Sequence, residues 1–186
     1  TSGPGATNTV TPVRDCTADS VPIVVICGQV PTAAIGSDAF QEAPVANIMG
    51  AVAKHCFLVT DPERLEATVR TAFEIARTGR PGPVVIDVPK DVQNWHGPFK
   101  GEGHLDIRGY RQRMSALQKS ALTEAQCNSF FAMLAESGRP LIYAGGGVIN
   151  GNGADALRAF ATDLGIPVVT TLMGSGAVDT QHPLAM

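Results

Sequence analysis

Four short stretches of consecutive apolar residues recur along the chain, and each begins at or just after a proline-containing turn. They occupy residues 21–26, 83–86, 141–144 and 167–169. Proline is tolerated at the first position of a strand. Because the stretches are apolar throughout and do not alternate with polar residues, they predict strands of a parallel sheet that is buried on both faces.

Amphipathic helices are predicted between these strands, over residues 62–78, 124–136 and 153–164. The first of them follows Asp61, a capping residue, and begins with proline. Thr123 and Gln126 have the spacing of a capping box at the start of the second helix. At helical spacing, the apolar face predicted for the first helix consists of Leu65, Val69, Ala72, Phe73 and Ala76.

This alternation of helices and strands predicts an α/β fold, with parallel sheets that carry helices on both faces. Residues 92–121 interrupt the alternation with glycines, a proline and several basic side chains. We interpret that segment as a linker between two consecutive domains, residues 1–91 and residues 122–186.

Composition excludes several classes of protein. Of the 186 residues, 17% are charged and 44% are hydrophobic, and the formal net charge is −3, which leaves no overall basic stripe for nucleic acid. The longest apolar run, residues 21–27, is far shorter than the ~18 residues of a membrane helix. Cys27 and Cys56 lie in apolar stretches, which favours buried thiols in a reducing compartment over disulfides. The chain starts at Thr1 and stops within an incomplete element, so we expect a segment of a longer polypeptide.

Three segments could carry chemistry. The glycine turn at residues 3–8 opens a helix, whose free N–H groups suit an anion or a polar cofactor edge, although a tight turn without a ligand is the simpler interpretation. The glycines at residues 145–147 follow a predicted strand but lack the spacing of a dinucleotide fingerprint, so they support an NAD site only weakly. Residues 28–44 are long for a loop after a strand, and such loops are often functional.

The polar residues near the end of the second predicted strand have a simpler explanation. Lys90 lies between Asp87 and Asp91, and we interpret the three as a solvated ion-pair cluster. His55 is interpreted as a structural histidine. No Ser-His-Asp arrangement and no spacing of metal ligands is evident.

Several motifs, taken in order, resemble one family. The segments TSGPGATN, GQVP, IGSDAFQE, GRPGPVVIDVPKDVQ and GIPVVTTLMGSG resemble the large, catalytic subunit of acetolactate synthase (acetohydroxyacid synthase), a thiamine-diphosphate-dependent enzyme. GPGATN and GRPGPVVID recur broadly among thiamine-diphosphate enzymes, whereas DAFQE and TLMG are narrower and point to the FAD-containing acetolactate synthases. The resemblance runs nearly end to end and is weakest over residues 94–121.

The resemblance implies a domain organisation and an activity. Residues 1–91 would be the C-terminal half of a pyrimidine-binding domain of thiamine-diphosphate-binding fold, and residues 122–186 the N-terminal part of a Rossmann-like central domain that holds FAD. The family decarboxylates pyruvate and joins the two-carbon unit to a second 2-oxo acid in branched-chain amino-acid biosynthesis. It uses thiamine diphosphate and Mg²⁺, and its FAD is structural.

Partners and location are also implied. The family forms its active site between two subunits, so a homodimer or higher oligomer and a regulatory small subunit are expected, with 2-oxo acids as substrates and neither nucleic acid nor membrane as a partner. A bacterial member would be cytoplasmic, and a eukaryotic one would lie in an organelle.

Site residues are carried over by their motifs. Gln41 would reach the cofactor and the reacting groups, and Phe40 would shape the substrate pocket beside it. Arg80 would contact FAD. The substrate channel would be lined by Ser20, Pro31, Ala39, Lys54 and Lys90, and the backbone contacts to FAD would come from Gly146, Thr171 and Leu172.

The sequence departs from the family's pattern at some positions, and other functions are left open. Thr32 and Ala33 replace a basic pair that many plant members carry. The family's activating glutamate and its Mg²⁺-diphosphate motif lie outside residues 1–186, so this segment alone is expected to be inactive.

The alternative functions are another thiamine-diphosphate enzyme (a glyoxylate carboligase or an oxalyl-CoA decarboxylase), a nicotinamide-dependent oxidoreductase suggested by residues 145–147, and a non-catalytic α/β binding module.

Overall fold

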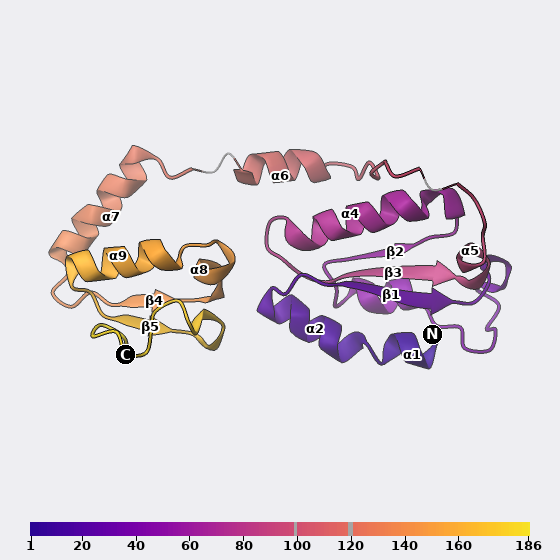
Figure 1. Cartoon of the computed structure of the whole chain (residues 1–186), viewed down its shortest axis with the longest axis horizontal. Helices are drawn as coiled ribbons and strands as arrows, with labels where there is room; N and C mark the ends of the chain where they lie inside the picture. The colour runs from indigo at the N-terminus through magenta and orange to yellow at the C-terminus, as the bar shows by residue number, and fades with distance from the viewer. Residues whose placement is uncertain (99, 119–120) are drawn as a thin grey trace. The chain divides into compact units, whose positions relative to one another are not determined.

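The computed structural model describes residues 1–98, 100–118 and 121–186. The chain divides into two compact units, Thr1–Lys119 and Ser120–Met186. Each unit contains parallel strands with helices packed against them (Figure 1), so the predicted α/β class is confirmed. No helix among the described residues is long and apolar enough to cross a membrane.

The first unit is built on a three-stranded parallel sheet in the order β1-β3-β2. Its strands are β1 (Val24–Gln29), β2 (His55–Leu58) and β3 (Val84–Pro89). β3 lies in the middle, and all six of its residues are buried. The strand expected over residues 21–26 is displaced toward the C-terminus, because backbone pairing with β3 continues through Gly28 and Gln29 after the apolar run has ended.

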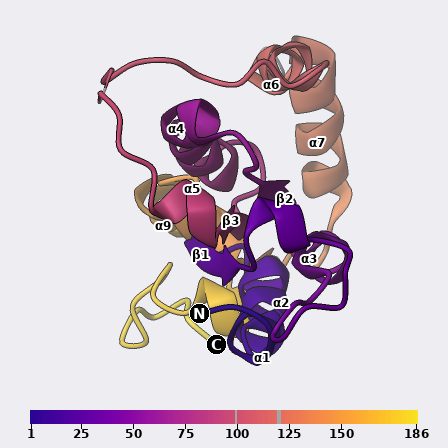
Figure 2. The same cartoon turned by 90° about the vertical axis from the view of Figure 1, so that its right-hand side faces the viewer.

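Helices cover both faces of this sheet (Figures 1 and 2). One face carries α4, which follows the short 3-10 turn η2. The other face carries α1, α2 and α3, and the short elements η1 and α5 follow β1 and β3. The bounds are α1 (Pro4–Thr7), α2 (Val10–Asp19), η1 (Thr32–Ala34), α3 (Val45–Gly50), η2 (Pro62–Arg64), α4 (Leu65–Arg77), α5 (Lys90–Gln93) and α6 (Tyr110–Gln118).

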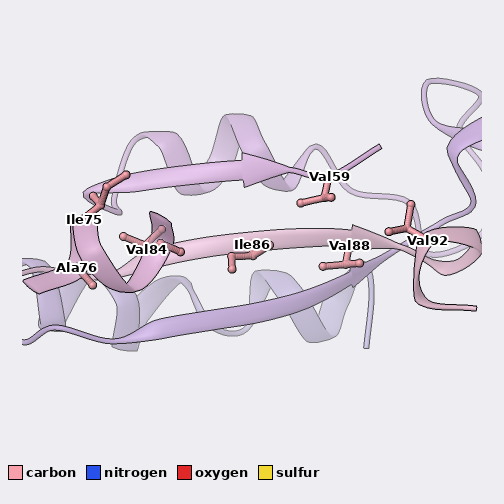
Figure 3. Packing of buried hydrophobic residues seen from close by; sticks show 8 residues of the cluster. Val59, Ile75, Ala76, Val84, Ile86, Val88 and Val92 are labelled. Atoms are coloured by element: carbon pink, nitrogen blue, oxygen red, sulfur yellow. The ribbon is translucent and has the colours of Figure 1, made fainter. Parts of the chain in front are cut away.

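Side chains of β3 alternate between two apolar clusters, as expected for a strand. Val84, Ile86 and Val88 join the cluster beneath α4, part of which is drawn in Figure 3. Val85 joins the cluster on the other face, where Met49 is fully buried. By the same alternation, Asp87 belongs to the face of Val85 and not to the α4 face.

The predicted helix 62–78 is confirmed, and four of the five residues of its predicted apolar face, all but Phe73, contact the core. The Asp61 carboxylate accepts from the Glu63 N–H at 3.0 Å, as expected of a capping residue. Phe73 is 54% exposed, whereas Ile75 is 5% exposed. The inward face is therefore centred on Ala72, Ile75 and Ala76, because the small alanines let the helix lie close to β3.

Part of the predicted linker packs against the first unit. Ile107 and Tyr110 contact the cluster beneath α4, and the Leu105 N–H donates to Thr71 Oγ1 at 2.8 Å. Residues 105–110 are therefore held on the first unit by apolar and polar contacts. Residues 99, 119 and 120 of the predicted linker lie outside the described residues.

The second unit contains two parallel strands, β4 (Ile142–Ala144) and β5 (Val168–Thr170), each within one residue of its predicted position. Its core is formed by Ala144, Ala161, Val168 and Val178. The capping box of Thr123 and Gln126 is confirmed. The helices are α7 (Glu124–Glu136), α8 (Gly146–Asn150) and α9 (Ala154–Leu164), and the 3-10 turn η3 (Leu172–Gly174) follows β5.

Candidate functional site

The predicted site residues of the first unit are divided between two edges of its parallel sheet. Pro31, Ala39, Phe40 and Gln41 follow β1, and Lys90 follows β3, so these five belong to the carboxyl edge. Ser20, Lys54 and Arg80 precede β1, β2 and β3 respectively and belong to the amino edge. Ligands of open α/β sheets bind at the carboxyl edge, which favours the Phe40–Gln41 loop as the centre of the candidate site.

The loop between β1 and α3, residues 30–44, is folded by its own polar groups. The Glu42 carboxylate accepts from the backbone N–H groups of Gly36 and of Ala39, the second at 3.1 Å. These bonds, the one from Gly36 first, lower the pKa of Glu42 below its ordinary range. At the start of the loop, the Thr32 N–H donates to Asp91 Oδ1 at 3.0 Å.

Gln41 has a strained backbone and a close neighbour. Its φ of 62° lies in the left-handed region, which non-glycine residues rarely adopt and which is concentrated at functional sites. A Cβ added to Gly3 would lie 2.6 Å from the Gln41 carbonyl oxygen, so the glycine turn at residues 3–8 packs directly against the Gln41 backbone. Phe40 is 91% exposed, which leaves its ring free to line a pocket with a ligand or another chain.

A buried polar pair lies at the base of this loop. The Gln29 Nε2 group donates to Asp87 Oδ2 at 3.0 Å and to the Ala43 carbonyl at 2.9 Å. Asp87 is 1% exposed, and burial raises its pKa from 3.8 to about 6. The interpretation of Asp87, Lys90 and Asp91 as a solvated ion-pair cluster is therefore wrong for Asp87, because its position in the central strand turns its carboxyl inward.

Ser20 and Arg80 meet at the C-terminal end of α2. Ser20 is the left-handed C-cap of that helix, and Arg80 Nε donates to its Oγ at 2.8 Å. The Arg80 guanidinium also donates to the Ala18 carbonyl at 2.9 Å. Arg80 thus satisfies a helix-end carbonyl and complements the negative end of the helix dipole.

Lys54 caps a helix in a similar way. Its ammonium donates to the Ile75 carbonyl and, at 2.6 Å, to the Thr78 carbonyl at the C-terminal end of α4. Burial lowers the pKa of Lys54 from its ordinary value. Lys90 is exposed at the start of α5, beyond the carboxyl end of β3. The structure therefore does not bring the two lysines together within one chain.

Three of the four residues predicted to contact FAD lie together in the second unit, and the fourth, Arg80, lies in the first. Gly146 follows β4 and Thr171 follows β5, at the same carboxyl edge. The Thr171 N–H donates to the Ala144 carbonyl at 2.9 Å, and a Cβ on Gly146 would lie 3.0 Å from Met173. Leu172 is 87% exposed. Glycines and an exposed apolar side chain at a carboxyl edge suit a flat cofactor.

The cysteines, His55 and the cavity beside α4 give little support for a second site in this chain. All four cysteines are free, and burial, followed by the charge of Asp87, raises the pKa of Cys56 to about 12, which disfavours a thiolate. The ring of His55 packs edge-on against Phe57, and burial lowers the pKa of His55. Within the described ranges, no group of three His, Cys, Asp or Glu residues is arranged to hold a metal ion. A cavity of about 510 Å³ beside α4, lined in part by Leu65 and Trp95, includes no predicted site residue.

Sequence reasoning did not identify Gln29, the burial of Asp87 or the contact of Gly3 with Gln41. Asp87 directly follows an apolar run, and that signal could have marked it as a strand residue. Gln29 and Gly3 gave no comparable signal, because their partners are distant in the sequence.

Comparisons with known proteins identify the family of the chain. Residues 1–50 match the family model of the thiamine pyrophosphate enzyme N-terminal TPP binding domain, and residues 127–186 match that of the thiamine pyrophosphate enzyme central domain. The chain is 46% identical over its whole length to an acetolactate synthase large subunit of Corynebacterium glutamicum, and covers 29% of that protein. It is also 44% identical over its whole length to acetolactate synthase 2, chloroplastic, of Nicotiana tabacum, and covers 27% of it.

A probable acetolactate synthase large subunit of Methanocaldococcus jannaschii is likewise 44% identical, with the whole chain aligned to 31% of that relative. The chain thus spans less than a third of the length of the relatives that it matches. Both family models describe the same class of enzyme, and the aligned segment reaches from one into the other. The chain therefore belongs to the thiamine pyrophosphate enzyme family, as a part of the sequence shared by acetolactate synthase large subunits.

Proposed function

We propose that the chain is part of a carboligase that decarboxylates pyruvate and joins the two-carbon unit to a second 2-oxo acid. The products would be 2-acetolactate, or 2-aceto-2-hydroxybutanoate when the second substrate is 2-oxobutanoate. The identity of 44–46% along the whole chain to acetolactate synthases carries this proposal. The strained Gln41 beside an exposed Phe40, at the carboxyl edge of the sheet, supports it.

In this proposal thiamine diphosphate supplies the electron sink for loss of carbon dioxide, and the protein supplies orientation. The Gln41 carboxamide donates and accepts hydrogen bonds to polar groups of the bound reactants. Phe40 excludes water from the reacting carbon atoms. Both side chains are exposed and lie beyond the end of β1, so they are accessible to a ligand.

The remaining predicted residues take supporting roles. Pro31, Ala39 and Lys90 line the approach to the loop. Ser20 and Lys54 are assigned to the substrate channel as well, although they belong to the opposite, amino edge of the sheet within one chain. Mg²⁺ is held with the diphosphate by residues outside this chain.

FAD would bind at the carboxyl edge of the second unit. Gly146, Thr171 and Leu172 offer backbone groups and an exposed apolar side chain there, and Arg80 is assigned to the same cofactor. The flavin is proposed as a structural group that takes no part in the main reaction.

The proposed assembly is a homodimer or higher oligomer with a regulatory small subunit, in the cytoplasm of a bacterium or in an organelle of a eukaryote. The assembly fits the exposure of Phe40, because a ring that is 91% exposed in one chain can be covered by a second chain.

A direct test uses the full-length protein and measures acetolactate formed from pyruvate with and without thiamine diphosphate. Activity should require the cofactor, and Q41A should lower kcat by about 10- to 100-fold. Q112A, at an exposed glutamine of α6, is the matched control and should leave kcat unchanged. Acetolactate formation that needs no thiamine diphosphate would refute the proposal.

The same preparation separates the alternatives. A glyoxylate carboligase or an oxalyl-CoA decarboxylase would prefer its own substrate over pyruvate. A nicotinamide-dependent oxidoreductase is disfavoured because the relatives named above are acetolactate synthases, and because the turn at residues 145–147 lacks the dinucleotide spacing.

A further inference from the structure

Gln29 closes the base of the loop that carries Phe40 and Gln41. Its Oε1 accepts from the Val30 N–H at 2.9 Å, and its Nε2 donates to the Ala43 carbonyl at 2.9 Å. Val30 is the first residue of the loop, and Ala43 is two residues beyond Gln41. One buried carboxamide therefore joins the two ends of the loop directly.

Asp87 determines which way that carboxamide faces. A carboxylate only accepts hydrogen bonds, so it pairs with the amide NH₂ and opposes the amide oxygen. Asp87 Oδ2 and the Ala43 carbonyl each take one of the two Nε2 protons of Gln29. If the carboxamide turned over, its oxygen would face two acceptors and its NH₂ would face the Val30 N–H, and all three bonds would be lost.

Asp87 is itself held in place by the central strand of the sheet. It lies in the central strand β3, between Cys27 of β1 and Leu58 of β2 in register, and is 1% exposed. Gln29 is 6% exposed. Side chains locked by packing hold a functional loop more accurately than exposed ones do.

We propose that Asp87 and Gln29 are positioning residues for Gln41, because Asp87 orients the Gln29 carboxamide and Gln29 fixes the loop at Val30 and Ala43. This inference rests on the proposed function, in which Gln41 contacts the reactants. Neither residue touches the substrate, so their loss misplaces Gln41 without removing it.

The test uses four variants of the full-length protein. D87A removes the acceptor, and Q29M removes the carboxamide at similar volume. D87N keeps an oxygen that accepts from Gln29. D15A, at an exposed aspartate of α2, is the matched control.

Two readouts are needed. Hydrogen exchange measured by mass spectrometry reports the order of residues 30–44 without any assay of activity. Acetolactate formation separates kcat from KM. Circular dichroism first establishes that each variant is folded, and Q29M provides the answer if D87A does not fold.

D87A and Q29M should each accelerate exchange in residues 39–43 by about 10-fold and lower kcat by roughly 10-fold with KM changed less than twofold. D87N and D15A should match the unchanged protein in both readouts. Unchanged exchange in both D87A and Q29M would overturn the inference, as would a D87N variant that behaves like D87A. If the unchanged protein makes no acetolactate, the proposed function fails, and the exchange measurement still decides whether these residues hold the loop.

Discussion

Replacement of Gly3 by alanine should displace the backbone of Gln41. The added Cβ would lie 2.6 Å from the Gln41 carbonyl oxygen and 3.0 Å from its Cα, whereas ordinary contact begins near 3.4 Å. One of the two backbones must therefore move by roughly 0.8 Å. Gly3 has a φ of 52° and a ψ of −119°, a combination that L residues rarely adopt, so alanine there also adds backbone strain of about 1–3 kcal/mol.

The expected loss of activity follows from this displacement. A shift near 1 Å in a group that orients reactants can lower the rate by about 100-fold, so G3A should reduce kcat for acetolactate formation by about 10- to 100-fold in the full-length protein. G165A is the matched control, because Gly165 has a φ of 64° and nothing lies within 4 Å of its added Cβ. Both variants place a Cβ on a residue with positive φ, although only Gly165 is in the αL region, and only G3A moves Gln41. Equal kcat values for G3A and G165A would show that this contact does not position Gln41.

Three further predictions concern stability and cofactor content. Burial raises the pKa of Asp87 from 3.8 to about 6, so its ionisation costs folding free energy as the pH rises between these values. Above about pH 6, the free energy of unfolding of D87N should therefore exceed that of the unchanged protein by up to about 3 kcal/mol, and below about pH 4 the two should be equal. Urea unfolding at both pH values measures the difference, and a difference independent of pH would contradict this. R80A removes the cap on the last turn of α2 and should lower stability by about 1 kcal/mol, measured by thermal unfolding, and an unchanged midpoint would contradict the capping role. G146A places a Cβ 3.0 Å from Met173 and should lower the flavin absorbance of the purified protein, whereas full flavin content would argue against FAD at this turn.

Four of the five described strands were predictable because consecutive apolar residues are what a buried parallel strand requires, whereas β2 was not among the predicted stretches. The ends of the strands were not predictable, because the hydrogen bonds of a sheet depend on the backbone and continue past the apolar run. β1 extends to Gln29 and β3 to Pro89 for this reason, and Asp87 is consequently a buried strand residue. Local spacing also predicted helix α4 and most of its inward face, but it placed Phe73 there in place of Ile75, because Ala72 and Ala76 approach β3 closely on the Ile75 side.

The candidate site was predictable only through its motifs. Contacts such as that of Gly3 with Gln41 join residues 38 positions apart, and no periodicity within either segment indicates them. The left-handed backbone of Gln41 likewise depends on the folded loop, because glutamine has no intrinsic preference for that conformation.

The division of the predicted residues between two sheet edges limits what one chain can do. The strand that follows Lys54, β2, has four residues and spans roughly 13 Å, and a lysine side chain reaches only about half of that distance. Lys54, which precedes β2 and is held by carbonyls of α4, therefore cannot share a pocket with Gln41 of the same chain without leaving those carbonyls. The hydrogen bonds of Lys54 to the end of α4 are enough to explain why Lys54 is partly buried. Lys90 is exposed at the carboxyl edge, and no such hydrogen bond of its side chain is among the described contacts. Of the two lysines assigned to the substrate channel, Lys90 is thus the one whose position favours that role.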